Sequence, residues 1–167
     1  MIPRIVVMGV SGCGKSAIGA ALAAATGARF IDGDDLHPTE NIEKMARGEP
    51  LDDADRAPWL DKVGQALRVE PPPVVIGCSA LKRAYRDRIR AGAGGNVLFV
   101  HLAGDKAVIA SRMTARKGHF MPPALLDSQF AALEPPEPDE AAVTVDIAPR
   151  RDAVVANIVA ALKNVRL

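Results

Sequence analysis

The chain has 167 residues, and its 21 lysines and arginines nearly balance its 20 aspartates and glutamates, giving a formal net charge of +1. That length suits a single domain with its own hydrophobic core, so one domain over residues 1–167 is expected. The balanced charge and the scarcity of aromatic residues (four Phe, one Trp and one Tyr) argue against nucleic acid or an anionic membrane as a partner.

Cysteine usage and hydropathy indicate a cytoplasmic protein. Cys13 and Cys78 are too few for a disulfide framework and have no companion cluster for a structural zinc. No apolar stretch reaches the roughly 20 residues that a membrane-spanning helix needs. The apolar run at residues 5–10 is also too short for the core of a signal peptide. A reducing cytosol is therefore the expected compartment.

The chain alternates short β-branched runs with amphipathic or alanine-rich stretches, a pattern typical of a parallel sheet covered by helices on both faces. Strands are expected at Arg4–Met8, Arg29–Ile31, Val74–Gly77, Val97–Leu102 and Val143–Ile147. Helices are expected at Lys15–Ala25, Thr39–Arg47, Ala54–Val69, Lys82–Ala91, Lys106–Lys117, Pro123–Ala132 and Arg151–Val165. The proline-rich segments 70–73 and 134–138 should connect elements within one domain, because the pieces they separate are too short to fold alone. The prediction is an α/β domain.

A phosphate-binding motif follows the first expected strand and opens an alanine-rich helix. The pattern G-x-x-x-x-G-K-[ST] is matched at every fixed position by Gly9-Val10-Ser11-Gly12-Cys13-Gly14-Lys15-Ser16. The backbone N–H groups of such a loop and the helix N-terminus bind phosphate oxygens, so these eight residues are expected to contact ATP. Lys15 should reach the β- and γ-phosphates, and the Ser16 hydroxyl should ligate Mg²⁺.

Other P-loop classes fit the sequence less well. The guanine-reading motif N-K-x-D of GTPases is absent, and a D-x-x-G match at residues 61–64 falls inside an expected helix. Acidic groups instead follow the second expected strand, at the sheet edge where ligands of doubly wound folds collect. Asp32 would hold Mg²⁺ through water, and Asp34 would accept the proton of a substrate hydroxyl. Capping of the helix that begins near Pro38 is an equally good explanation for both.

Several segments together resemble the gluconokinase family. They are Gly33-Asp34-Asp35-Leu36-His37-Pro38, Asn41-Ile42 with Lys44-Met45, the run from Gly48 to Leu60, Cys78-Ser79-Ala80-Leu81-Lys82 with Tyr85-Arg86-Asp87, Arg112-x-x-x-Arg116-x-x-His119-Phe120-Met121-Pro122, and Leu125-Leu126-x-Ser128-Gln129-Phe130 with Leu133-Glu134. Together they cover roughly residues 5 to 135, while the C-terminal part matches only in its strand–helix layout. The departure from the family pattern is Cys13, where a Ser or another small residue is usual.

The resemblance implies phosphoryl transfer from ATP to the 6-hydroxyl of D-gluconate, with Mg²⁺ as cofactor. It also implies a fold similar to shikimate and nucleoside monophosphate kinases, with a five-stranded parallel sheet in the order 2-3-1-4-5 flanked by helices. A mobile lid would lie at about residues 113–124. A homodimer is implied by the resemblance alone.

Gluconate is an anion that carries several hydroxyl groups, so its pocket needs cations for the carboxylate and polar groups for the polyol. Arg56 is expected to bind the carboxylate in a bidentate manner, although a surface salt bridge with Asp53 or Asp55 is the alternative. Lys82 and Arg86 lie one helical turn apart and are expected to face the same pocket, unless they are ordinary solvated charges.

The remaining acceptor-side residues come from the matching segments. Ser79 and Gln129 complete the substrate site that the resemblance implies. His37 and His119 are candidate acid–base groups, although His37 could equally belong to a helix-entry turn and His119 better suits a contact made by the lid. Trp59 is more often a core residue than a platform for a sugar, and the core role is favoured here.

Two arginines lie one turn apart at the end of the helix that leads into the expected lid. Cations there suit the helix dipole, but they would also stabilise the transferring phosphoryl group. By analogy with shikimate kinase, Arg112 would stack on adenine and Arg116 would meet the phosphates. Pro149, in the loop after the last strand, would form the other wall of the adenine site. The expected catalytic residues are Lys15, Asp34 and Arg116.

Two other functions stay open at this point. One is a kinase of the same fold that acts on a shikimate-like acid or a nucleoside monophosphate. The other is a nucleotide-binding regulator without turnover. Separately, Cys13 and Cys78 are expected near the carboxyl ends of neighbouring strands, where oxidation could link them, although two buried, reduced thiols are favoured.

Overall fold

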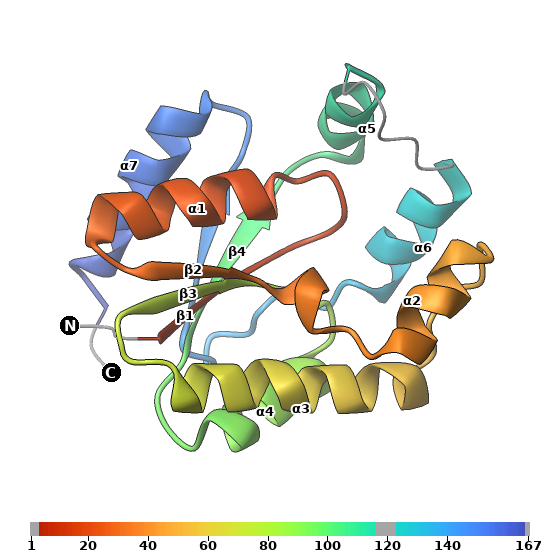
Figure 1. The fold of residues 1–167 in the computed structure, drawn as a ribbon. Helices are drawn as coiled ribbons and strands as arrows, with labels where there is room; N and C mark the ends of the chain where they lie inside the picture. Colours follow the sequence, from red (N-terminus) through yellow and green to blue (C-terminus); the bar gives the residue numbers. More distant parts are fainter. Residues whose placement is uncertain (1–3, 116–122, 166–167) are drawn as a thin grey trace.

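The computed structural model describes residues 4–115 and 123–165, and its centre is a five-stranded parallel sheet (Figure 1). The strands are β1 (Arg4–Met8), β2 (Arg29–Asp32), β3 (Val74–Gly77), β4 (Leu98–Ala103) and β5 (Ala142–Asp146). They pair in the order β2-β3-β1-β4-β5, and each pairing is parallel. The order 2-3-1-4-5 is thus confirmed, and each strand lies within one residue of its expected position.

Helices cover both faces of the sheet. They are α1 (Lys15–Thr26), α2 (Thr39–Ala46), α3 (Asp53–Val69), α4 (Arg83–Ala93), α5 (Lys106–Ala115), α6 (Pro123–Ala132) and α7 (Arg151–Leu162), with a 3-10 turn η1 (Gly33–Leu36) after β2. Helices α1 and α7 pack on one face, while α3 and α4 pack on the other (Figure 1). Helices α2, α5 and α6 lie beyond the carboxyl ends of the strands, on the right in Figure 1. This end of the sheet is where α/β folds bind their ligands.

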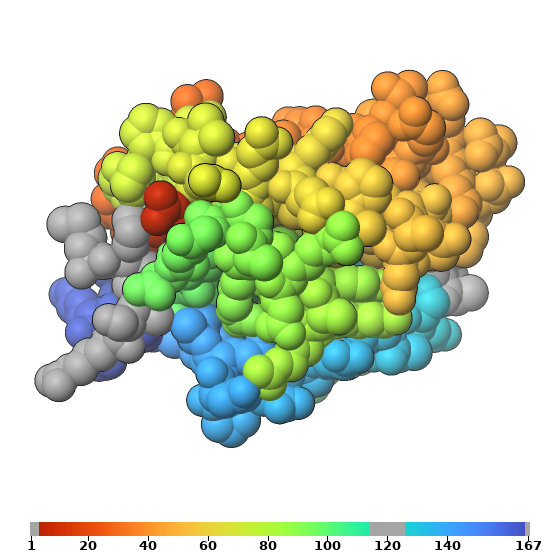
Figure 2. Space-filling view, turned by 90° about the horizontal axis from the view of Figure 1, so that it is seen from below, coloured from red at the N-terminus to blue at the C-terminus, as the bar shows by residue number. Residues whose placement is uncertain are grey.

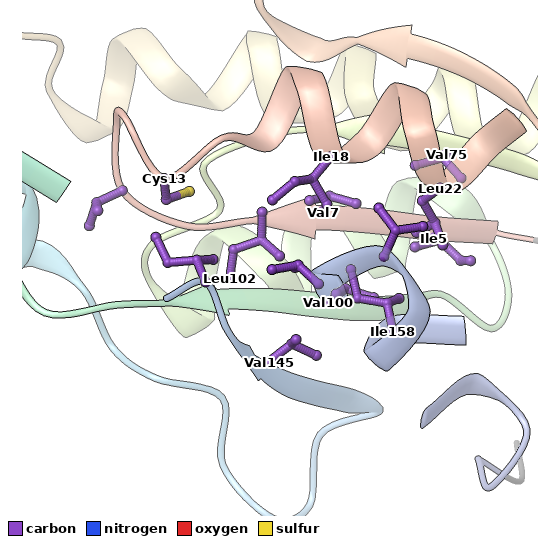
Figure 3. Close-up of a cluster of buried hydrophobic side chains, with 14 of the residues drawn as sticks. Ile5, Val7, Cys13, Ile18, Leu22, Val75, Val100, Leu102, Val145 and Ile158 are labelled. Carbon is purple, nitrogen blue, oxygen red and sulfur yellow. The ribbon is translucent and has the colours of Figure 1, made fainter. Parts of the chain in front are cut away.

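Strand alternation divides the core into two hydrophobic clusters. Ile5 and Val7 of β1 face α1 and α7, whereas Val6 and Met8 face α3 and α4. Figure 3 shows the first cluster, with residues of α1 and α7 packed over the central strands. All four of these side chains are almost completely buried, as expected for central strands of a sheet that is covered on both faces.

The two cysteines belong to different clusters. Cys13 packs in the α1–α7 cluster (Figure 3), and Cys78 packs in the α3–α4 cluster on the other side of the sheet. Burial raises the pKa of the Cys13 thiol, and it raises that of Cys78 to about 12, so neither forms a thiolate readily. Both are free cysteines, and they pack in separate clusters as small buried residues.

Local sequence explains where α3 begins. The Asp52 side chain accepts a hydrogen bond from the Asp55 backbone N–H at 2.7 Å, and the Asp55 carboxylate accepts one from the Asp52 N–H at 3.0 Å. This reciprocal capping box satisfies two N–H groups that the first turn would otherwise leave without partners. No helix among the described residues is long and apolar enough to cross a membrane.

Candidate active site

The phosphate loop runs from the end of β1 into α1, and its glycines adopt a backbone that other residues rarely reach. Gly12 and Gly14 have φ values of 81° and 96°, and a Cβ on Gly12 would collide with the Met113 side chain of α5. The Lys15 ammonium donates hydrogen bonds to the carbonyl oxygens of Gly9 and Val10, each at 3.0 Å. The lysine therefore lies across the loop that is expected to hold the triphosphate.

Ser16 and Asp32 come together at the start of α1 and the end of β2. The Ser16 hydroxyl donates to Asp32 Oδ2 at 3.1 Å, and Asp32 Oδ1 accepts the Asp34 backbone N–H at 3.0 Å. A hydroxyl and a carboxylate are the hard oxygen ligands that Mg²⁺ takes in kinase sites, where phosphates and water complete its shell. The described residues contain no cluster of three or more His, Cys, Asp and Glu side chains suited to an all-protein metal site.

The η1 turn presents Asp34 at the edge of the site. Gly33 passes so close to the Gly77 carbonyl of β3 that a Cβ would collide with it, so glycine is required at that step. The pKa of Asp34 is raised, because desolvation by the surrounding protein and the negative charge of Asp32 outweigh the charge of Lys15. A carboxyl with a raised pKa holds a proton more readily, which suits a group that accepts one during reaction.

The ring of His37 is held in place by Trp59 and Asn41. Its ring stacks on Trp59 with centroids 4.1 Å apart, and its Nδ1 lies 3.2 Å from Asn41 Nδ2, which also donates to the Asp55 carbonyl at 2.9 Å. An amide nitrogen can only donate, so Nδ1 accepts and the neutral ring carries its hydrogen on Nε2. Burial lowers the pKa of His37 more than the charge of Asp34 raises it, which favours the neutral form.

A cluster of two cations around one tyrosine lies between α3 and the start of α4. The Arg56 guanidinium donates to the Tyr85 hydroxyl at 3.2 Å, and the Lys82 ammonium lies 5.6 Å from the centre of the Tyr85 ring. Asp53 accepts a hydrogen bond from the Tyr85 hydroxyl and lies 3.6 Å from Lys82. We call Asp53, Arg56, Lys82 and Tyr85 the acceptor cluster.

Tyr85 is a site residue that the sequence reasoning missed. Tyr85 follows Lys82 by three positions in the part of the chain that resembles the family, residues 78–87. Three positions along a helix bring two side chains near one another, and this spacing could have indicated the contact. The alternative for Arg56 was a surface salt bridge with Asp53 or Asp55, but its guanidinium instead bonds to the Tyr85 hydroxyl. Asp55 instead pairs with Lys44 at 2.6 Å.

Arg86 does not share the pocket of Lys82, and the expectation that it contacts the substrate needs correction. Its side chain is completely buried, and its Nε and Nη2 donate to the two carboxylate oxygens of Glu140 at 2.7 and 3.0 Å. Its remaining nitrogen donates to the Ala80 carbonyl at 3.0 Å. A one-turn spacing aligns two residues along a helix, but here the first lies at the N-cap and the second points into the core.

Ser79 and Gln129 lie beside the phosphate loop. The Ser79 carbonyl accepts the Gly9 backbone N–H at 3.2 Å, and Gln129 Oε1 of α6 accepts the Ser11 N–H at 2.7 Å. The contact made by Gln129 is therefore with the expected ATP site.

The expected adenine residues also lie near one another. Arg112 of α5 donates to the Ala148 carbonyl at 3.1 Å, which places it next to the loop that carries Pro149. Arg116 and His119, together with most of the expected lid, lie outside the described residues.

Comparisons with known proteins show which family this chain resembles. A family profile described as an AAA domain matches residues 5–136. "Thermosensitive gluconokinase" of Escherichia coli is 52% identical over 138 residues, covering 81% of this chain and 73% of the relative. "Probable gluconokinase" of Mus musculus is 45% identical, covering 95% and 97% of the two chains.

Solved structures give the same result. The crystal structure of a gluconokinase from Sinorhizobium meliloti is similar with a TM-score of 0.91 and 50% identity, covering 97% of this chain and 92% of that one. Shikimate kinase from Aquifex aeolicus has a TM-score of 0.63 at 15% identity, covers 96% of each chain and shows the shared fold alone. The identities to named gluconokinases, over most of both chains, decide the matter: this chain belongs to the gluconokinase family.

Proposed function

We propose that this protein transfers the γ-phosphoryl group of ATP to the 6-hydroxyl of D-gluconate, giving 6-phosphogluconate and ADP. The observation that carries the proposal is a row of interacting groups from the phosphate loop to the acceptor cluster. The Ser16 hydroxyl bonds to Asp32, which accepts the N–H of Asp34. Trp59 of α3 bonds to the Gly33 carbonyl and stacks on His37, and Arg56 of the same helix bonds to Tyr85. A kinase for a hydroxy acid needs a phosphate site, a group that orients the hydroxyl, and a cation for the carboxylate, in this order.

On the ATP side, the backbone N–H groups of residues 9–16 hold the triphosphate. The Lys15 ammonium exchanges the carbonyls of Gly9 and Val10 for β- and γ-phosphate oxygens, where it offsets charge that develops during transfer. Ser16 and Asp32 would hold Mg²⁺, the serine through its hydroxyl and Asp32 through water. When bound, the ion supplies charge neutralisation and fixes the phosphate oxygens for in-line attack.

On the acceptor side, Asp34 orients the 6-hydroxyl and accepts its proton as the hydroxyl oxygen bonds to the γ-phosphorus and the bond to the β-phosphate oxygen breaks. The Nε2–H of His37 donates to a hydroxyl of the polyol. Arg56 and Lys82 bind the carboxylate at the far end of the substrate, the arginine through its two-pronged fork. Ser79 and Gln129 position the phosphate loop, because they accept the N–H groups of Gly9 and Ser11.

The remaining assignments follow the family resemblance. Arg112 and Pro149 enclose adenine, Arg116 meets the transferring phosphoryl group, and His119 contacts the acceptor. The same resemblance leads us to propose a cytoplasmic homodimer.

Production of ADP in the presence of Mg²⁺ and ATP tests the proposal, with D-gluconate, shikimate, AMP or no acceptor at equal concentration. We expect turnover that depends on gluconate. Turnover with shikimate alone would mean that the acceptor is a different hydroxy acid from the one proposed, since Arg56 and Lys82 could bind any carboxylate. AMP-dependent turnover would require a site for a base, which Trp59 does not offer because it is only 3% exposed. ATP binding without turnover of any acceptor would contradict the proposal and indicate a nucleotide-binding regulator.

A further inference from the structure

The loop between β3 and α4 has an unusual backbone that its own sequence does not explain. Ala80 has a φ of +44°, and it is the one non-glycine residue with a positive φ in the part of the chain that the structure describes. A Cβ clashes with the neighbouring carbonyl in this left-handed region, so alanine stays there only where its surroundings hold it. The question is what holds the turn at Ala80.

Hydrogen bonds to the loop carbonyls come from Arg86 and from the segment after α6. Arg86 Nη1 donates to the Ala80 carbonyl at 3.0 Å and to the Leu81 carbonyl at 3.3 Å. The Glu134 N–H donates to the same Leu81 carbonyl at 2.7 Å, and Glu134 Oε1 accepts the N–H of Arg83, the first residue of α4. The turn is therefore held from one side by a guanidinium and from the other by a connector.

Glu140 in turn holds Arg86. Its side chain is 1% exposed, and it accepts hydrogen bonds from Arg86 through both oxygens, from Arg90 at 3.0 Å and from the Glu137 N–H at 2.8 Å. Burial alone would raise the pKa of Glu140, but these hydrogen bonds lower it to about 2, so the carboxylate stays ionised. In Figure 2 the connector that carries Glu140, light blue, lies alongside α4, green.

A buried ion pair is by itself a weak source of stability, because desolvation offsets its attraction. The pair matters more for geometry than for stability, because the planar guanidinium binds Glu140 through Nε and Nη2 and the loop through Nη1. Replacing it with a lysine would keep the charge but lose this fork.

We infer that Arg86 is a positioning residue, which Glu140 aligns and which fixes the left-handed turn at Ala80. On one side the turn places the Ser79 carbonyl, which accepts the Gly9 N–H of the phosphate loop at 3.2 Å. On the other side it places Lys82 in the acceptor cluster. Only the assignment of Lys82 to the substrate rests on the proposed function.

The first test needs no acceptor. Amide hydrogen exchange, measured by mass spectrometry, is compared between the wild-type protein and Arg86→Lys in peptides that contain residues 78–86 and Gly9. We expect exchange there to accelerate about tenfold, the size of a lost hydrogen bond to a charged group. Arg88→Lys is the matched control, since Arg88 lies on the same helix in an exposed pair with Asp61.

The second test asks whether Arg86 acts through Ala80. Arg86→Lys should lower kcat/KM for gluconate about tenfold, mainly through KM, at a temperature where the protein is fully folded. Glycine adopts a positive φ without strain, so Ala80→Gly should restore much of this loss in the Arg86→Lys background and change the wild-type enzyme little. Glu140→Gln, which keeps the size of the side chain, receives the same measurements if Arg86→Lys does not fold.

Each outcome decides the inference. If Arg86→Lys or Glu140→Gln lowers only the melting temperature, and leaves exchange at residues 78–86 and kcat/KM unchanged, the pair is merely structural and the inference is overturned. If Ala80→Gly does not restore the kcat/KM that Arg86→Lys has lost, the inference that Arg86 acts through the turn at Ala80 is overturned. A wild-type protein that does not phosphorylate gluconate refutes the proposed acceptor, while the exchange experiment still decides the role of Arg86.

Discussion

The imidazole of His37 lies nearly flat on the indole of Trp59, with ring centroids 4.1 Å apart and planes inclined by 17°. The indole itself is buried, and its Nε1 donates to the Gly33 carbonyl at 2.8 Å. One core side chain of α3 therefore holds both ends of the turn that carries Asp34. Trp59 supports the site from beneath, in agreement with the expectation that it belongs to the core.

Trp59→Phe should test this support. Phenylalanine keeps an aromatic surface for His37 but cannot donate to Gly33, whose buried carbonyl then loses its partner. We expect the free energy of unfolding to fall by about 1–3 kcal/mol, and KM for gluconate to rise as His37 shifts. Because Trp59 is the one tryptophan in the chain, unfolding in urea is followed by circular dichroism. An unchanged midpoint and KM would show that the indole N–H is dispensable.

The raised pKa of Asp34 predicts how activity depends on pH. Asp34 must be ionised to accept a proton, so kcat/KM should fall as the pH drops through a midpoint above the ordinary value of 3.8. The groups that act on it are Asp32, Lys15, His37 and Asp35. Between 3.8 and the raised pKa the folded state binds more protons than the unfolded state, so in this window the free energy of unfolding should decrease as the pH rises.

Asp34→Asn should remove that midpoint together with most of the activity. The amide cannot accept the proton, so kcat should fall by about 10² or more, while ATP binding is retained. Steady-state rates and binding of a fluorescent ATP analogue measure the two effects. Asp35→Asn, one residue further along the same turn, is the control. Undiminished turnover in Asp34→Asn would exclude Asp34 as the base.

Arg56→Lys separates charge from geometry in the acceptor cluster. Lysine keeps the positive charge but loses the two-pronged fork and the bond to Tyr85. KM for gluconate should rise about tenfold, and KM for ATP should stay near the wild-type value. Arg88→Lys provides the same chemical change at an exposed position outside the site. Equal effects on both substrates would place Arg56 in the support of the fold rather than at the carboxylate.

The strands and the phosphate loop could be predicted because their signals are local. β-branched runs mark buried parallel strands, and the loop motif carries its own glycines, lysine and hydroxyl. The η1 turn was missed because four residues, Gly33–Leu36, are too few to show a periodicity. Helix α4 begins one residue later than expected because Lys82 is extended and acts as the N-cap, and it ends two residues later, at Ala93.

The site was harder to predict where its partners are distant in sequence. Arg86 and Glu140 are 54 positions apart, and nothing in a one-turn spacing tells that a guanidinium will turn into the core to meet a carboxylate on another segment. The orientation of the His37 ring likewise depends on Asn41 and Trp59 together, through a hydrogen bond and a stacked ring. Ser16 and Asp32 were easier, since the start of α1 and the end of β2 both lie at the carboxyl edge of the sheet.

The proximity of Ser16 and Asp32 leads to a prediction about Mg²⁺. Asp32→Asn keeps one oxygen to accept the Asp34 N–H, and its NH₂ group can donate to the Ser16 hydroxyl oxygen in place of the bond that this hydroxyl now donates. The turn should therefore stay intact while the negative charge is lost. The Mg²⁺ concentration that gives half-maximal activity, measured at fixed ATP, should rise about tenfold, the typical loss when a group that orients a metal's surroundings is changed. Asp35→Asn should not shift it, because this change removes a carboxylate from the same turn while the Ser16 hydroxyl bonds to Asp32. A shift of equal size in both variants would mean that general negative charge attracts the ion, and that Asp32 has no specific place in its shell.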